Sequence, residues 1–238
     1  MTEAGIPTCP GADLPASVED AILTRRSVRA FLPRFVPVAL VSHLIAVASR
    51  APSGGNIQPW KVHVVMGPAK ARLEADLLAT FCDPDQEPEP EYDYYPQKWS
   101  QPYLARRRAL GRSLYDLLGI ERRDVPAMRS HQAENFRFFG APVGLFFSLA
   151  RTLSQGSWLD AGMFIQTFMI AARGAGLHTC PQAAFTSYHR VVRRHVRIPD
   201  EDILLCGMAL GYEDPTRREN ALRTAREPVE GFTVFYDI

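Results

Sequence analysis

Residues 156–176, GSWLDAGMFIQTFMIAARGAG, restrict the fold most, because as a helix they are apolar around almost the whole circumference. We expect Ser157 to cap this helix, with Asp160 in its first turn and Gly174 or Gly176 at its end. A helix that is apolar on every side is buried on every side. The sequence therefore predicts a central helix, or a helix that lies partly in a subunit interface.

Shorter segments of extended and helical pattern make up the rest of the chain. Residues 60–66, WKVHVVM, are rich in valine and bounded by Gly67 and Pro68, which predicts a strand. Residues 141–149, APVGLFFSL, are apolar at most positions, which predicts a strand buried on both faces. This mixture of helices and strands is typical of the α+β class. We expect further extended segments at 178–185 and 202–212, a strand or an arm at 232–238, and helices at 17–26, 37–51, 73–81 and 104–120.

The balance of charge argues against two classes of partner. The chain has 27 Lys and Arg against 26 Asp and Glu, so a net charge of +1 provides no global field for nucleic acid or an anionic membrane. The arginines at 106–108 and 112 are interpreted as a solvated helix face. The most apolar run, 161–172, is much shorter than the roughly 20 residues that a membrane-spanning helix needs.

Cysteine spacing and the N-terminus indicate a reducing compartment. Cys9, Cys82, Cys180 and Cys206 form no CxxC pair, and the first residues lack the apolar stretch of a secretory leader. We therefore expect reduced thiols in the cytoplasm. A redox role for Cys180, which precedes a proline and has no evident base beside it, stays an alternative.

Familiar motifs for metal, nucleophilic and nucleotide chemistry are missing from the sequence. The six histidines show no HxxxH or HxH spacing, so no metal site is expected, and each is interpreted as a surface or structural residue. There is no GxSxG, which argues against a serine nucleophile on a strand-to-helix turn. There is also neither a GxxxxGK[ST] loop nor a GxGxxG turn.

Two local motifs remain as candidates for binding. In RRSVRAF, residues 25–31, three arginines bracket a serine where a helix ends, and guanidinium groups with a hydroxyl suit a phosphate monoester. A solvated turn fits the same residues. The loop APSGGNIQPW, residues 51–60, has glycines that let the backbone approach a flat ligand. Its polar side chains, from Ser53, Asn56 and Gln58, can bind the edges of such a ligand.

A long segment after residue 82 is rich in proline, acids and aromatic residues. Ordinary connections need about 4 to 6 residues, so a segment of this length is either disordered or a lid over a site, and its aromatic residues favour the lid. The competing interpretation is that the rings pack on an outer helix. The rings that could line a substrate site belong to Tyr92, Tyr94, Tyr95, Trp99 and Tyr103.

Several of these motifs, taken in order, resemble the FMN-dependent nitroreductase family. RRSVRAF followed by APSGGNIQPW resembles the family's signature pair, and the segments at 141–149, 156–185 and 203–212 are similar to its middle and end. REPVEGF, residues 226–232, is similar to its late basic site. Only residues 83–139 are poorly covered by the family pattern.

The resemblance implies a three-layer α/β sandwich of the α+β class, with a mainly antiparallel central sheet. It implies one domain over residues 1–238, with a lid-like insertion at about 83–139. It further implies an intertwined homodimer that binds two FMN molecules at the subunit interface.

Site residues follow from the resemblance motif by motif. Arg25, Ser27 and Arg29 match the positions that hold the FMN phosphate and the ribityl or pyrimidine edge, and Arg26 lies between them. Late phosphate-binding positions are matched by Arg226, with Arg223 as its neighbour. The loop from the other subunit that covers the isoalloxazine ring is matched by Pro52, Ser53, Asn56 and Gln58.

The segment CPQAAF matches the part of the family whose backbone faces the flavin. The resemblance implies that the N–H of Ala184, or of Ala183, donates to flavin N5. This sequence departs from relatives that carry Glu-Gly at that place, so a ring-facing carboxylate is missing. The residues of this segment expected against the cofactor are Cys180, Pro181, Gln182, Ala183 and Ala184.

The activity implied by the resemblance is hydride transfer from NADPH or NADH through FMN to a nitroaromatic or quinone acceptor, with ping-pong kinetics. Other tasks of the same fold stay open: reductive dehalogenation, azoline dehydrogenation and flavin breakdown. A non-catalytic flavin-binding protein is the third possibility. The sequence does not choose between NADH and NADPH, nor does it identify the physiological acceptor.

Overall fold

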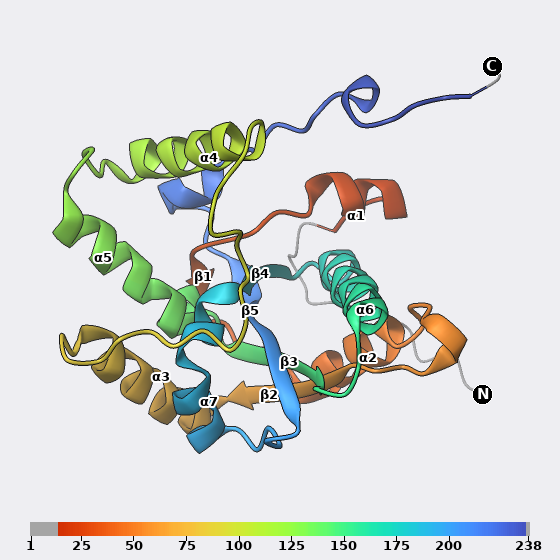
Figure 1. Cartoon of the computed structure of the whole chain (residues 1–238), viewed down its shortest axis with the longest axis horizontal. Helices are drawn as coiled ribbons and strands as arrows, with labels where there is room; N and C mark the ends of the chain where they lie inside the picture. Colours follow the sequence, from red (N-terminus) through yellow and green to blue (C-terminus); the bar gives the residue numbers. More distant parts are fainter. Residues whose placement is uncertain (1–13, 237–238) are drawn as a thin grey trace.

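The computed structural model describes residues 14–236, which fold around a five-stranded sheet whose ladders are all antiparallel (Figure 1). The order across the sheet is β1-β5-β3-β2, and β4 also pairs with β5. The predicted α+β class is therefore confirmed. Cys9, Asp237 and Ile238 lie outside the described residues. The strands are β1 (Phe31–Leu32), β2 (Lys61–Met66), β3 (Val143–Ala150), β4 (His178–Gln182) and β5 (Asp202–Glu213).

Helices cover both faces of the sheet, which gives the expected three layers. Figure 1 shows α2 and α6 on one side and α3 and α7 on the other. The α-helices are α1 (Val18–Thr24), α2 (Val38–Ala48), α3 (Gly67–Cys82), α4 (Tyr103–Leu118), α5 (Val125–Ala133), α6 (Gln155–Gly174) and α7 (His189–His195). The 3-10 helices are η1 (Gly54–Asn56), η2 (Glu134–Gly140), η3 (Ala183–Tyr188), η4 (Arg218–Ala221) and η5 (Val229–Gly231).

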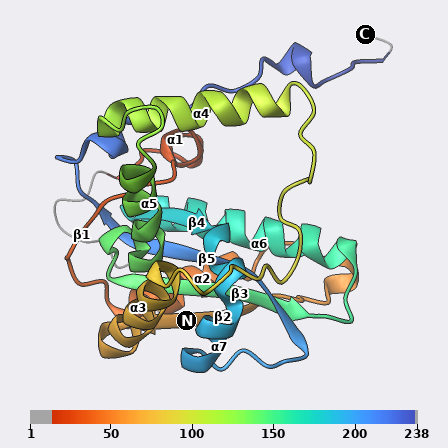
Figure 2. The same ribbon diagram turned by 60° about the vertical axis from the view of Figure 1, so that its left-hand side comes forward.

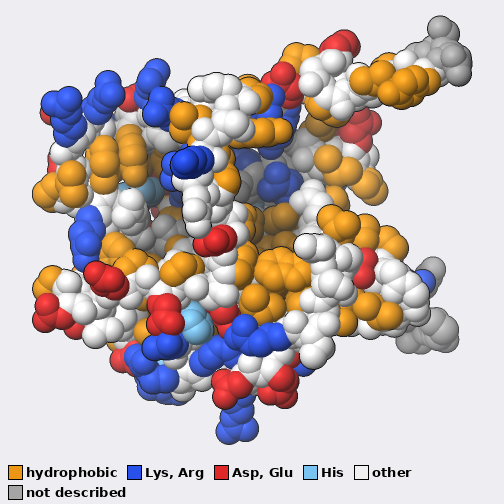
Figure 3. Space-filling view, in the orientation of Figure 1, with side chains coloured by type: hydrophobic (Ala, Val, Ile, Leu, Met, Phe, Trp, Pro, Cys, Tyr) orange, Lys and Arg blue, Asp and Glu red, His pale blue; other side chains and the backbone are white. Residues whose placement is uncertain are grey.

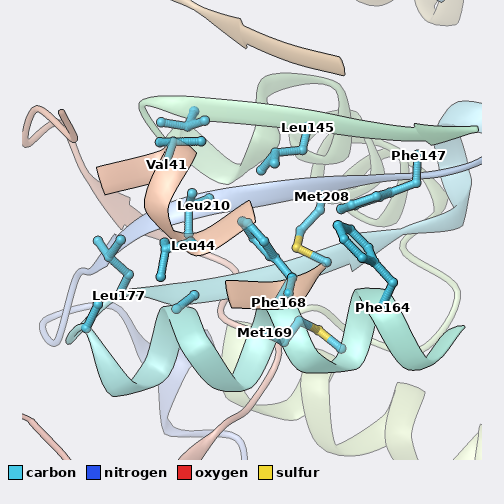
Figure 4. Packing of buried hydrophobic residues seen from close by; sticks show 14 of the residues in the cluster. Val41, Leu44, Leu145, Phe147, Phe164, Phe168, Met169, Leu177, Met208 and Leu210 are labelled. Carbon is cyan, nitrogen blue, oxygen red and sulfur yellow. The ribbon is translucent and has the colours of Figure 1, made fainter. Parts of the chain in front are cut away.

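Strand β3 lies at the centre of both cores, as its apolar sequence predicts. Because successive side chains of a strand point to opposite faces, Leu145 and Phe147 enter the core against α2 and α6. Figure 4 shows this core, in which the Phe147 ring lies 6.3 Å from the rings of Phe164 and Phe168. On the opposite face Phe146 packs in a second core with α3, η2 and η3. Burial on both faces is therefore confirmed for this strand.

Helix α6 departs from two expectations. Its N-cap is Ser154, whose backbone is extended, whereas the predicted cap Ser157 lies inside the helix and is buried. An N-cap needs a non-helical backbone, and only Ser154 has one. The helix is also not buried on every side, because Leu159 is 73% exposed. The expectation of a helix buried on every side is therefore wrong for the single chain, and the subunit interface stays a prediction.

The insertion at 83–139 contains two helices, α4 and α5, joined to α3 by an irregular segment at 83–102. Figure 2 shows α4 above the sheet layers and α3 below them. The segment at 83–102 connects the two helices. Sequence patterns had not predicted α5, α7 or the two-residue strand β1. Tyr103, expected in the lid, is the first residue of α4.

The C-terminal tail forms no strand over its described residues, which end at 236. After η5 it extends away from the body (Figure 1) and exposes Phe232, Val234 and Phe235. Of the two expectations for this segment, a strand or an arm, the described residues fit the arm. No helix within residues 14–236 is both long and apolar enough to cross a membrane.

Candidate functional site

A cavity of about 800 Å³ collects the basic residues that the sequence singled out. It lies where the end of α1, the end of α6 and the segment after η4 meet, and Figure 3 shows basic side chains inside a hollow between α4 and α1. No described Asp or Glu lines this cavity. Its polar lining consists of Thr24, Arg25, Arg26, Ser27, Arg29, Arg173, Arg223, Thr224 and Arg226.

The electrostatics of this cavity fit an anion. Burial, followed by the nearby charge of Arg226, lowers the pKa of Arg25. Two guanidinium groups that repel each other bind a dianion well, because the anion removes the repulsion and accepts charge-assisted hydrogen bonds. Arg26 differs, since it forms an ion pair with Glu213. The residues present therefore fit the phosphate that the resemblance implies, with Arg26 as the member already paired.

Local structure explains why these arginines converge. Helix α1 ends at Thr24, the backbone of Arg25 is extended, and the chain then leaves the helix through Arg29 without regular secondary structure. The Arg29 N–H donates to Asn220 Oδ1 at 2.9 Å, and Asn220 Nδ2 donates to Ala30 O at 2.8 Å. These bonds tie the motif to η4, three residues before Arg223. A local N-terminal motif and a C-terminal basic segment are thereby brought to one place.

A second cavity, of about 560 Å³, adjoins the first through Arg29, which lines both. One wall is the segment Cys180–Ala184, and the opposite part of the lining comes from the insertion. Tyr92, Tyr94 and Tyr95 line this cavity as the lid hypothesis expects, whereas Trp99 and Tyr103 do not. The two cavities therefore adjoin at Arg29, one lined mainly by basic side chains and the other partly by aromatic rings.

The backbone at Ala183 and Ala184 is suited to donate into the second cavity. Strand β4 ends at Gln182, and η3 begins at Ala183. The first N–H groups of a helix have no acceptor within the helix, so they are available to a ligand. Residue 183 is alanine and has no carboxylate, so the side chain at this position of the wall is small and apolar.

Side chains of β4 help to hold this wall in place. Gln182 Nε2 donates to Asn135 O at 2.7 Å, while its buried Oε1 has no hydrogen-bond partner. The Cys180 thiol is buried, and burial raises its pKa to about 11. A thiol with that pKa is protonated near neutral pH, which argues against the redox alternative for Cys180.

The glycine-rich loop lies apart from both cavities. Gly54 N–H donates to the two carboxylate oxygens of Asp160 in α6, at 3.2 and 3.3 Å. Asn56 and Gln58 have positive φ angles of 56° and 49°, an unusual backbone for side chains other than glycine. Neither cavity is lined by any of the four predicted loop residues, Pro52, Ser53, Asn56 and Gln58.

Several lining residues were missed by the sequence patterns. Burial, followed by the charge of Arg29, lowers the pKa of His131, which sits in the second cavity. Phe139 also lines it and has a φ of 54°, next to Phe138 at 50°. No local motif marks these residues, because α5 and η2 acquire their role only by packing over β4. Among residues 14–236, no group of three His, Cys, Asp or Glu side chains could hold a metal ion.

Comparison with known proteins gives one consistent result. The sequence model of the Nitroreductase family matches residues 22–212. The chain is 40% identical over 217 residues to 4-nitrobenzoate reductase of Pseudomonas putida, covering 91% of this chain and 94% of that protein. It is 36% identical over 218 residues to chloronitrobenzene nitroreductase of Comamonas testosteroni, covering 92% and 96%.

Solved structures agree with the sequence relatives. The FMN and NADPH-dependent nitroreductase NfnB of Sphigopyxis sp. strain HMH superposes with a TM-score of 0.90 at 35% identity, covering 93% of this chain and 100% of that chain. The FMN-dependent NfnB of Mycobacterium smegmatis, solved in complex with NADPH, gives a TM-score of 0.87 at 32% identity, with 92% and 97% covered. The expected fold is therefore confirmed.

Proposed function

The chain belongs to the nitroreductase family, and from this premise we propose that it is an FMN-dependent oxidoreductase that passes hydride from NADPH or NADH to a nitroaromatic or quinone acceptor. The observation that carries the proposal is a pair of adjoining cavities: an arginine cavity lined by no described acid shares Arg29 with a cavity that Ala183 and Ala184 line. Nitroaromatic acceptors are favoured over the other tasks of the fold by the names of the relatives that match most of the chain.

Each part of the site has a distinct task. FMN, when bound, supplies the hydride chemistry, accepting hydride from the nicotinamide and releasing it to the acceptor. Arg25, Arg223 and Arg226, which line the first cavity, would hold its phosphate, and Arg29, which lines both cavities, would bind the ribityl or pyrimidine edge. The Ala184 N–H, in the first turn of η3, would donate a hydrogen bond to the ring at N5 and so orient and polarise it.

The shape of the second cavity supports ping-pong kinetics. Its lining includes tyrosine rings and the small side chains of Ala183 and Ala184 beside polar groups, which suits flat molecules such as a nicotinamide or a nitroaromatic ring. Both molecules need the same position beside Ala184, so the oxidised nicotinamide leaves before the acceptor enters. The chain therefore contributes binding and orientation, and no side-chain acid or base is assigned to the reaction.

We further propose a cytoplasmic homodimer in which each subunit completes the partner's site. Support comes from the glycine-rich loop, which reaches neither cavity of its own chain. Support also comes from Leu159 and Met163, exposed apolar residues of α6 that lie beside Pro52 of that loop. The described cysteines are free thiols, in keeping with a reducing compartment.

An absorption spectrum of the purified protein tests this function directly. We expect the bands of an oxidised flavin, bleaching on anaerobic addition of NADPH, and return of the bands on addition of 4-nitrobenzoate. A colourless protein that takes up no added FMN contradicts the proposal. A flavin that NADPH and NADH both fail to bleach contradicts the catalytic part and favours a non-catalytic flavin-binding protein.

A further inference from the structure

A buried carboxylate stands at the start of the row of tyrosines. The Glu91 side chain is 3% exposed, although it belongs to an irregular surface segment. Its Oε1 accepts a hydrogen bond from Arg193 Nη2 at 2.7 Å and forms a second ion pair with Arg151. Its Oε2 accepts the Leu204 N–H at 2.9 Å. Neither flavin binding nor hydride transfer, as described above, uses this residue.

The charges around Glu91 keep it ionised. Burial alone raises the pKa of a carboxyl group, but the Leu204 N–H and the Arg193 guanidinium outweigh it and lower the pKa of Glu91. His189 Nδ1 lies 3.9 Å from Oε1 and adds to this effect when protonated. A buried, ionised and fully bonded carboxylate holds its segment in one geometry, since any displacement leaves buried charges unpaired.

Backbone bonds join the same segment to the wall of the acceptor cavity. The Glu89 N–H donates to Ser187 O at 3.0 Å, and the Glu91 N–H donates to Thr186 O at 3.3 Å. Both acceptors belong to η3, the 3-10 helix that begins at Ala183. The start of the insertion is therefore attached to the element that carries the proposed N5 donor.

The tyrosines follow Glu91 as a continuous row of rings. Tyr92 OH donates to Leu205 O at 2.5 Å, and its ring meets Trp158 edge-on with centroids 4.8 Å apart. The Tyr94 ring lies 6.2 Å from that of Tyr92, and the Tyr95 ring lies 4.7 Å from that of Tyr94. The far end of the row is held by Arg107 of α4, 5.5 Å above the Tyr95 ring.

We propose that Glu91 is a positioning residue for the acceptor: its ion cluster fixes the start of segment 83–102, so that Tyr92, Tyr94 and Tyr95 form a fixed wall of the acceptor cavity. This inference rests on the proposed function, because it assigns the cavity to a flat aromatic acceptor. The start of the row is attached by the Glu91 ion cluster, by the two backbone bonds to η3 and by the contacts of Tyr92, and its far end is attached by Arg107. We expect loss of the ion cluster to loosen the start of the row even with the other attachments in place. The partners of Glu91 do not include Arg25, Arg223 or Arg226, so we expect the FMN phosphate to be held without the cluster.

The test compares Glu91→Gln with Glu89→Gln in the FMN-loaded full-length protein. Glu89 lies two residues away on the same segment and pairs with Arg190 at 2.8 Å, but these side chains are 59% and 71% exposed, so the pair is weak. For E91Q we expect KM for 4-nitrobenzoate to rise about tenfold, equivalent to about 1.4 kcal/mol. We expect kcat to stay within about twofold, because the proposed hydride path is intact. E89Q is expected to match the parent protein.

Limited proteolysis without acceptor tests the attachment separately from the activity. We expect E91Q to be cleaved within residues 83–102 faster than the parent protein and E89Q, while FMN affinity is unchanged. Glu91→Asp, which keeps the charge, is expected to recover part of the KM. If E91Q does not fold, Arg151→Met removes one partner and is expected to show the same two changes to a smaller degree.

Parent-like KM together with parent-like cleavage in E91Q, or in Arg151→Met where E91Q does not fold, overturns the inference. So does faster cleavage with an unchanged KM, because the wall would then have no part in acceptor binding. If the parent protein reduces no nitroaromatic at all, the proposed function fails, and with it the assignment of the wall to an acceptor. Cleavage of E91Q would still show whether Glu91 holds the segment, so the two failures are distinguishable.

Discussion

At the scale of single residues, the arginine cavity is organised by repulsion as much as by attraction. Arg25 has a lowered pKa because of burial and of its neighbour Arg226, and no described acid lines the cavity to compensate these charges. Arg226 is held in place by its own segment, where its Nη1 donates to Thr224 Oγ1 at 2.6 Å. Such a site is unfavourable when empty and favourable when it holds a dianion.

Replacement of Arg226 by Gln tests this interpretation. We expect FMN affinity to fall about 10- to 100-fold, because a hydrogen bond to a charged group contributes about 1.5–3 kcal/mol. Quenching of FMN fluorescence during titration of the apoprotein measures the change. The matched control is Arg72→Gln, an exposed arginine on α3 away from the cavity, which is expected to bind FMN like the parent. Equal affinity for the two variants would exclude Arg226 from the phosphate site.

At the scale of elements, the junction of β4 and η3 is positioned by close contact with β5. Phe185, two residues into η3 from Ala183, packs directly on Gly207 of β5, where β5 pairs with Gln182. A Cβ at Gly207 would overlap that ring, with Phe185 Cε2 only 2.7 Å away. The glycine therefore allows η3, and with it the Ala183–Ala184 backbone, to lie close to the sheet.

The variant Gly207→Ala measures how much the stability of the fold and the affinity for FMN depend on this contact. We expect the free energy of unfolding of the apoprotein to fall by about 1–3 kcal/mol, as in other overpacked cores. FMN affinity should fall as well, because Phe185 cannot move without η3. Urea denaturation and flavin titration give the two values. The control is Gly111→Ala in α4, where nothing lies within 4 Å of an added Cβ. Its free energy of unfolding should rise by up to about 1 kcal/mol. A stability equal to that of this control would contradict the packing argument.

At the scale of the whole molecule, the described chain leaves apolar surface in places that a second copy would cover. Leu159 and Met163 on α6 lie beside the glycine-rich loop, and the tail exposes Phe232 and Phe235. Exposed apolar residues that gather next to an incomplete site are typical of a subunit interface. In the proposed dimer, cofactor binding and assembly would be coupled, since the loop lines neither cavity of its own chain.

Leu159→Glu tests this coupling. We expect the protein to become monomeric in size-exclusion chromatography with light scattering, because a charge in an apolar interface is costly to bury. Bound FMN should be lost in the same preparation. Val125→Glu on α5, equally apolar and 65% exposed, is the control and should remain a flavin-containing dimer. An L159E protein that stays dimeric would place the interface elsewhere.

Local chemistry determined the larger part of the fold and one end of the site. The Ser17 side chain caps α1 by accepting from Asp20 N, three residues further on, at 3.0 Å. Strand β3 packs into two cores because its sequence is apolar at most positions. The three arginines of RRSVRAF lie within five residues, so the sequence pattern alone identifies them as a candidate anion site. These features depend on neighbours in the sequence, where spacing is visible.

Tertiary structure alone decided the features whose partners are distant in the sequence. The Glu91 side chain is bonded by Arg151, Arg193 and Leu204. The spacing of residues within the insertion does not predict these partners, because they lie outside it. The apolar pattern of α6 did not determine which side of the helix its own chain covers, and the structure leaves Leu159 exposed. The sequence thus determines which surfaces must be buried and which charges must be paired. Only the folded chain determines which residues bury those surfaces and pair with those charges, because packing joins residues irrespective of their separation along the backbone.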